Sequence, residues 1–276
     1  MLTVDLDRLG LRRDDWLLDA GCGGGRHCFG ALDRGANTVG LDLDAPSLRI
    51  ARAGIHERRV RGRGLLHGGV LRGDVFHLPF RDGSFDRVIC SEVMEHVHDY
   101  GGAVRELVRV LKPGGTIGVT IPTAISEWFY LAATRLYFES PGGHIRVFRP
   151  RDLSLALAQA GVRVDGVGFA HALHSPYWLV RAGLGLDDET PGPTLAFRRF
   201  LIRAAVSRVW TRVEHALDWI WPKSLVLYGT RSATGLAGPG AAKPRHPPSL
   251  ASASDVPSRL NSTLAHRASL AAERPS

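Results

Sequence analysis

Three acidic residues stand at or just after the ends of short apolar runs in the first third of the chain. Asp19 precedes a stretch with glycines at positions 21, 23, 24 and 25, and Asp42 and Asp74 belong to the next two runs. A carboxylate beside a bare glycine turn attracts a cation and repels a pyrophosphate. Asp42 occupies the place where a carboxylate accepts both ribose hydroxyls, and Asp74 can accept from an adenine amino group, with Val75 and Phe76 beside the ring. We expect an adenosine ligand with a cationic end.

The glycine stretch argues against two other nucleotide ligands. A phosphate-binding P-loop requires a lysine after its glycines, and none follows here. The dinucleotide fingerprint GxGxxG has Arg26 at its third glycine position, so it fits poorly. S-adenosylmethionine (SAM), which carries an amino group and a sulfonium, matches the three carboxylates. A lone aspartate at a strand end is often only a helix cap, and we expect that role for Asp44.

A second group of candidate residues lies in the sequence SEVMEHV, residues 91–97. Glu92, Glu95 and His96 are spaced i, i+3, i+4, so on a helical turn they would share one face. Two carboxylates and an imidazole could bind a divalent ion there, and His144 would complete the set. Without a metal, His96 could act as a general base or line the pocket.

The strands and helices that must position these residues alternate along the chain. Apolar runs with strand character alternate with helix-like stretches from residue 15 to residue 169, and a last strand is expected at residues 223–231. Such alternation is typical of a parallel sheet with helices on both faces, an α/β Rossmann-like three-layer sandwich. In these sheets the ligand lies outside the carboxyl ends of the strands, where the glycine turn falls.

Two segments interrupt the alternation, at residues 123–150 and 171–222, and we expect them to form a helical cap or lid over the substrate. The arginines of residues 194–221 spread around more than half of a helical wheel, which favours a lid or dimer contact, although weak membrane association stays open. We expect a single domain over residues 1–231. Residues 232–276 are rich in Pro, Ala and Ser and are expected to be a disordered tail.

The composition bears on the partners and the cellular location expected for the protein. The net charge is +8, and all but three of the basic residues are arginines. Heavy use of Arg, Ala and Gly is also what a GC-rich genome produces, so the charge is weak evidence for a nucleic-acid partner, and we expect none. Cys22, Cys28 and Cys90 form no CxxC pair or zinc spacing, which predicts buried, reduced thiols. The first residues show no secretory signal and no apolar run is long enough to span a membrane, so a cytoplasmic location is expected.

Five motifs occur in the order and at the spacing found in class I SAM-dependent methyltransferases, which the chain resembles over residues 15–122. They are LLDAGCGGG, VGLDLD, GDVFHLPF, FDRVICSEVMEHV and LKPGGTIGVTIP, and SLVLYGTR is similar to that family's seventh strand. The resemblance implies a seven-stranded sheet with an antiparallel last strand. It also implies SAM-binding residues, namely Asp19, Gly21, Cys22, Gly23, Asp42, Leu43, Asp74, Val75, Ser91 and Glu92.

The E-x-x-E-H run resembles that of the ubiquinone-pathway O-methyltransferases and of the small-RNA 2′-O-methyltransferases. The resemblance implies Glu95 and His96 as catalytic residues. It also implies that Mg²⁺ or another divalent ion on Glu92, Glu95, His96 and His144 would lower the pKa of a substrate hydroxyl. We therefore expect methyl transfer to a hydroxyl of a small molecule. Methylation at carbon or nitrogen of a metabolite, lipid or quinone, and SAM binding without catalysis, remain alternatives.

Overall fold

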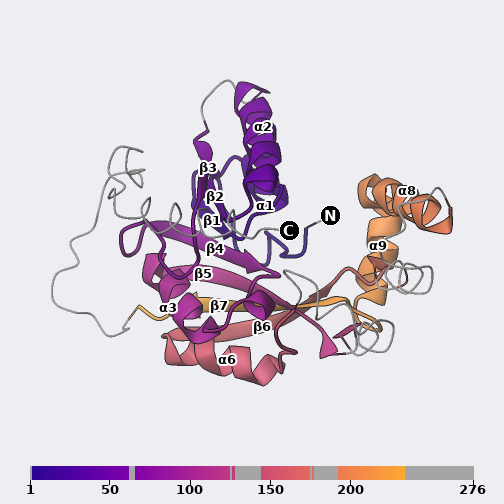
Figure 1. The fold of residues 1–276 in the computed structure, drawn as a ribbon. Coiled ribbons are helices and arrows are strands. Elements are labelled where there is room, and N and C mark those ends of the chain that lie inside the picture. Colours follow the sequence, from indigo (N-terminus) through magenta and orange to yellow (C-terminus); the bar gives the residue numbers. More distant parts are fainter. Residues whose placement is uncertain are drawn as a thin grey trace, which may run out of the picture.

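The structure is a computed structural model that describes residues 2–61, 66–124, 126–127, 144–174, 176 and 192–233. Seven strands form one sheet in the order β3-β2-β1-β4-β5-β7-β6 (Figure 1). The strands are β1 Trp16–Ala20, β2 Asn37–Asp42, β3 Gly68–Arg72, β4 Phe85–Ser91, β5 Leu111–Pro122, β6 Val162–Ala170 and β7 Ser224–Arg231. Strands β1 to β5 pair in parallel, whereas β7 runs antiparallel to both of its neighbours. The predicted fold class is confirmed.

Helices cover both faces of this sheet. On the faces lie α1 Arg26–Asp33, α2 Ala45–Arg61, α3 Tyr100–Val110 and α6 Pro150–Gln159. Two further helices, α8 Pro193–Val206 and α9 Arg208–Leu217, lie beyond the strand ends, and Met94–His96 forms a short 3₁₀ turn. Figure 1 shows α1 and α2 on one side of the sheet and α3 and α6 on the other. The layering follows from the crossovers that parallel strands require.

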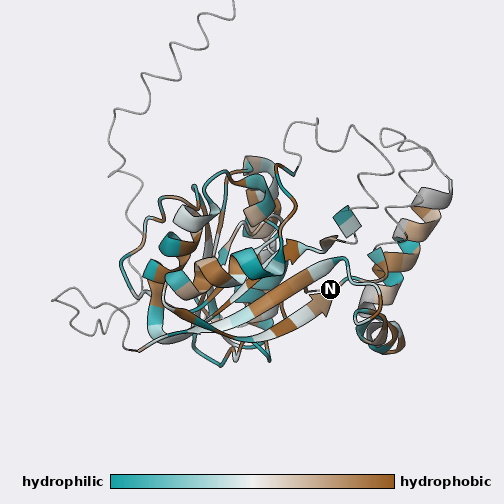
Figure 2. Ribbon diagram, turned by 90° about the horizontal axis from the view of Figure 1, so that it is seen from below, coloured by the Kyte–Doolittle hydropathy of each residue, from teal (hydrophilic) through white to brown (hydrophobic). Residues whose placement is uncertain are grey.

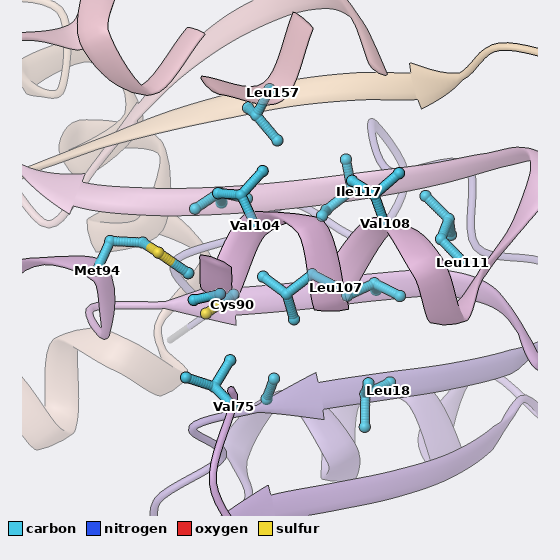
Figure 3. Close-up of a cluster of buried hydrophobic side chains, with 14 of the residues drawn as sticks. Leu18, Val75, Cys90, Met94, Val104, Leu107, Val108, Leu111, Ile117 and Leu157 are labelled. Carbon is cyan, nitrogen blue, oxygen red and sulfur yellow. The ribbon is translucent and has the colours of Figure 1, made fainter. Parts of the chain in front are cut away.

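Alternation along the central strands fills a core on each face. Leu17 and Ile89 pack with α1 and the N-terminal segment, whereas Leu18 and Val88 face α3 and α6. Figure 3 shows the second core, in which Leu107 of α3 lies over β4 and β5. The sheet is buried on both faces, so its strand order is fixed by packing and its carboxyl edge is held in place.

The described part of the second insert is helical, but it forms two helices. The continuous helix-like pattern of residues 194–221 breaks at Ser207, whose backbone is extended at φ −95° and ψ 121°. The insert leaves the sheet at Ala170 and returns at Ser224, so α8 and α9 lie at the carboxyl edge of the parallel strands (Figure 1). Figure 2 shows hydrophilic and hydrophobic residues along both helices. No helix within the described ranges is long and apolar enough to cross a bilayer.

Two smaller predictions are also met. All three cysteines are buried free thiols, and burial raises the pKa of Cys90 well above its usual range. Asp44 caps α2, because its Oδ2 accepts a hydrogen bond of 2.9 Å from the Ser47 amide. The predicted tail from residue 234 onward, and most of the insert at residues 123–150, lie outside the described residues.

Candidate active site

The glycine turn after β1 forms the floor of a pocket. Gly21 has φ +77°, and a Cβ at this position would lie 2.2 Å from Val93 Cγ2, so only glycine fits. Gly23 also has positive φ, but a Cβ there would meet no atom within 4 Å. The pocket has a volume of about 400 Å³ and is lined by Gly21, Cys22, Gly23, Gly24, Arg26, His27 and Ser91. The bare turn leaves a concave space of the size that small ligands occupy.

Asp19 lies behind this turn at the end of β1. It is fully buried, and its Oδ1 has no hydrogen-bond partner. The nearest basic nitrogen is Nδ1 of His27, at 3.6 Å. Asp19 Oδ2 accepts from the Cys28 thiol at 3.7 Å, and a buried carboxylate with one oxygen left unsatisfied is unfavourable unless a positive or donor group compensates it. The residues therefore fit a ligand with a cationic end in the pocket, as SAM has.

Asp42 connects the second strand to the glycine turn. Its Oδ2 accepts from the Gly23 amide at 2.7 Å, and its Oδ1 accepts from the Asp44 amide at 2.8 Å. A carboxylate offers about four lone-pair sites, so Asp42 can still accept from two ribose hydroxyls. Leu43 beside it is 60% exposed at the same edge. The predicted position of the ribose is thus available.

Asp74 follows β3 and shapes the next loop. Its Oδ1 accepts from the Phe76 amide at 3.0 Å. The side chain of Val75 is buried in the core, where Figure 3 shows it near Leu18. Phe76 is only partly buried. The apolar side chain left for an adenine ring is therefore that of Phe76, and Val75 supports the loop from below.

The end of β4 differs from the prediction. Glu92 has φ +56°, and only Met94–His96 forms a 3₁₀ turn, so the expected helical face of Glu92, Glu95 and His96 does not form. Ser91 Oγ lies 3.1 Å from Thr120 Oγ1. Glu92 accepts from the Thr120 hydroxyl at 2.9 Å and pairs with Lys223 Nζ at 3.2 Å. A non-glycine residue at positive φ is strained, and these contacts hold it.

The pKa of Glu92 reflects these contacts. Burial alone would raise it, but Lys223, Thr120 and Ser224 together lower it below its usual value. Glu92 is therefore ionised and already paired with a lysine. Its carboxylate stands apart from the group formed by the other predicted metal ligands.

Glu95, His96 and His144 do come together, and we name them the β4 cluster. Each offers one ligand atom, and these atoms lie within 4.8 Å of one another. The rings of His96 and His144 meet edge to face, with centroids 4.8 Å apart. Glu95 is 1% exposed, and neither of its carboxylate oxygens has a hydrogen-bond partner. Burial first, and then the charge of Glu92, raise the pKa of Glu95 well above its usual range.

The sequence did not reveal two supporting residues. Glu127 Oε1 lies 2.8 Å from His144 Nδ1, so it orients the ring that lies beside Glu95. Arg26 lines the pocket, and burial lowers its pKa while Asp19 and Glu92 oppose that shift. Glu127 falls in the insert, where no motif marks it, and Arg26 entered only as a mismatch to a dinucleotide fingerprint.

The sequence is similar to those of known methyltransferases. Residues 18–119 match the methyltransferase domain family. The chain is 33% identical over 140 residues to methyltransferase GfsG of Streptomyces halstedii, which covers 46% of this chain and 49% of that protein. It is 32% identical over 162 residues to the ubiquinone biosynthesis O-methyltransferase of Idiomarina loihiensis, covering 55% and 65%. The chain thus spans less than two thirds of either relative.

A solved SAM-dependent methyltransferase from Methanosarcina mazei has the same fold, with a TM-score of 0.54 and 17% identity over 84% of this chain and 99% of that one. The matched family covers the glycine turn, the three strand-end carboxylates and the β4 end. These are the parts that form the pocket described above. This sequence match, together with the sheet order and its antiparallel β7, supports the class I SAM-dependent methyltransferase superfamily for the matched residues 18–119.

Proposed function

We propose that the protein transfers the methyl group of SAM to a hydroxyl oxygen of a small molecule. The observation that carries this proposal is the buried, unpartnered carboxylate of Glu95 next to the glycine pocket. Val93, two residues earlier, lies directly against Gly21, so the β4 cluster borders the cofactor site. A carboxylate and two imidazoles beside a methyl donor suit the deprotonation of a weakly acidic acceptor.

The reaction needs an oxygen in line with the sulfonium–methyl bond. The acceptor oxygen forms the new O–C bond as the S–C bond breaks, and the sulfur leaves as the neutral thioether of S-adenosylhomocysteine. Without a bound metal, the acceptor proton passes to His96, which is exposed at the turn after β4. Asp19 favours the cationic cofactor over the neutral product, because only the former carries the sulfonium charge.

We further propose that Glu95, His96 and His144 hold a divalent ion such as Mg²⁺. When bound, it would lower the pKa of the acceptor hydroxyl. The contact of Glu127 with His144 Nδ1 leaves Nε2 toward Glu95, 4.0 Å from its Oε1. A carboxylate on the other ring nitrogen is the usual support of a metal-bound histidine. Glu92 belongs to this set only if it releases Lys223.

Residues 1–231 would then be the catalytic domain, with the two inserts as the acceptor cap. Trp219 and Ile220 just after α9 are 72% and 73% exposed, which favours a lipophilic acceptor and brief contact with a membrane surface. The cytoplasmic location and the absence of a nucleic-acid partner stay predictions. Transfer to carbon or nitrogen, and SAM binding without catalysis, are the alternatives.

Calorimetric titration with SAM tests the proposal, on the unaltered protein and on Asp42→Ala. We expect binding that Asp42→Ala weakens by at least roughly 100-fold, because two charge-assisted hydrogen bonds are lost. Asp44→Ala is the matched control, since it removes a neighbouring carboxylate that only caps α2. Failure to bind SAM would overturn the proposal. Binding that ignores Mg²⁺ would leave methyl transfer with His96 as the base.

A further inference from the structure

A second histidine–carboxylate group lies at the end of β6, and we name it the β6 cluster. His171 directly follows β6, His174 comes three residues later, and Glu214 lies on α9. Each offers one ligand atom, and these atoms lie within 4.8 Å of one another. None of the three belongs to the pocket lining or to the β4 cluster.

Two polar atoms of this cluster, one on His174 and one on Glu214, lack hydrogen-bond partners within the described part of the chain. Glu214 is 3% exposed, and its Oε1 has no hydrogen-bond partner. His174 Nδ1 is also buried and unpartnered, and it lies 3.8 Å from Glu214 Oε1. That separation is too long for a hydrogen bond. Leaving such buried groups unsatisfied is unfavourable, which indicates that another group belongs between them.

The surrounding contacts hold the cluster in position. His171 has φ +68°, a strained backbone for a non-glycine residue. Its Nε2 lies 2.9 Å from the Thr3 hydroxyl, which fixes the ring. Asp218 Oδ1 accepts from the Ala172 amide at 2.8 Å and so joins α9 to the segment after β6.

We propose that His171, His174 and Glu214 bind a divalent transition-metal ion of the zinc type. Two imidazole nitrogens and one carboxylate oxygen form the three-ligand set of zinc sites that keep an open fourth position. Ligands at about 2.1 Å in a tetrahedral site lie roughly 3.4 Å apart, so the 3.8 Å gap closes with small side-chain shifts. Mg²⁺ usually keeps several water ligands, and this group is more buried than the β4 cluster, whose His96 is exposed.

The position of the site gives the ion a role. It joins α9 of the acceptor cap to the end of β6, although β6 ends at Ala170 and α9 begins only at Arg208. Arg26, which lines the glycine pocket, has its Nη1 3.5 Å from His171 Nε2. The ion would therefore fix the cap beside the cofactor pocket. Its open position would accept water or a small oxygen or nitrogen ligand from the cap side.

Cobalt titration of the metal-stripped full-length protein tests this, because tetrahedral Co²⁺ absorbs visible light far more strongly than octahedral Co²⁺. We expect an intense visible band that saturates at one Co²⁺ per chain and is abolished by added Zn²⁺. His174→Ala and Glu214→Gln should each weaken binding by at least roughly 100-fold, since loss of an outer partner alone removes about 10–100-fold. The His174 side chain is 34% exposed, so its replacement leaves the fold intact.

His144→Ala and Glu95→Gln are the matched controls from the β4 cluster. They should leave the cobalt band unchanged, and SAM titration of all four variants shows that each is folded. A band lost in these controls but kept in His174→Ala would overturn the proposal, because the ion would belong to the β4 cluster. Absence of any tetrahedral band would also overturn it, and the β6 cluster would then be a buried ion pair.

Discussion

The β4 and β6 clusters contain the same kinds of side chain but are built in different ways. Two members of the β4 cluster are adjacent in sequence, on one turn after a central strand, and the third reaches them from the first insert. The β6 cluster joins the end of the edge strand β6 to a helix of the second insert. The first borders the glycine pocket through Val93, and the second does so only through Arg26.

This difference suggests a catalytic role for the β4 cluster and a supporting role for the β6 cluster. The β4 cluster stands where the sheet itself fixes its geometry, beside the place proposed for the methyl group. The β6 cluster stands where the cap must be attached to the sheet. Because Val93, two residues before Glu95, lies directly against Gly21 of the pocket, we propose catalysis for the β4 cluster and cap attachment for the β6 cluster.

The largest expected effect is on kcat, which should fall when the β4 cluster is altered but not when the β6 cluster is. His96→Ala should lower kcat by about 10²–10⁴-fold, the usual contribution of a general base, while SAM affinity stays unchanged. His174→Ala should leave kcat within the same order of magnitude, because His174 is not one of the residues that line the pocket. Single-turnover methyl transfer is the measurement. Equal losses in both variants would break the comparison.

The second prediction concerns the turn that connects the β4 cluster to the cofactor. Gly21→Ala should destabilise the protein by about 2–4 kcal/mol, since it adds both backbone strain and a clash with Val93. Gly23→Ala is the control, because its Cβ meets open space and only strain of roughly 1–2 kcal/mol is added. Thermal melts should rank the two variants in this order, and Gly23→Ala should still weaken SAM by intruding on the pocket.

The third prediction uses the pKa of Glu95, which burial and Glu92 raise. Stability from its protonated form is present below the unfolded pKa of about 4.3 and is lost as pH rises through the folded pKa. Glu95→Gln never ionises. Without metal, its Tm should equal that of the unaltered protein at pH 4 and exceed it by a few degrees at pH 8, since about 1 kcal/mol shifts Tm by roughly 2–4 °C. A Tm difference that does not change with pH would contradict the assignment.

The smallest effect tests the support of the β6 cluster. Thr3→Val removes the hydroxyl next to His171 Nε2 and should weaken Co²⁺ binding by about tenfold, as outer partners of metal ligands do. Thr3→Ser keeps the hydroxyl and should bind as the unaltered protein does. If Thr3→Val and Thr3→Ser bind alike, the hydroxyl does not orient the ring.

The sequence predicted the parts that depend on local pattern. The strand ends that carry Asp19, Asp42 and Asp74, and the cap at Asp44, follow from short motifs and were placed correctly. The geometry of Glu92 was predicted wrongly. The i, i+3, i+4 spacing was interpreted as a helix, and it cannot reveal that Glu92 adopts a left-handed backbone conformation held by Thr120 and Lys223. The contact of Thr3 with His171 spans 168 residues, and no periodicity encodes such a pairing.

The placement of β7 has a consequence for synthesis. This last strand lies between β5 and β6 and pairs with both, over residues Ser224–Arg231. Among the described strands β6 pairs with β7 alone, so during synthesis it stays unpaired until β7, which ends at Arg231, has emerged from the ribosome. Long-range pairing of this kind slows folding and leaves strand edges exposed. A nascent chain stalled before residue 224 should therefore bind chaperones, even though its cofactor half is already complete.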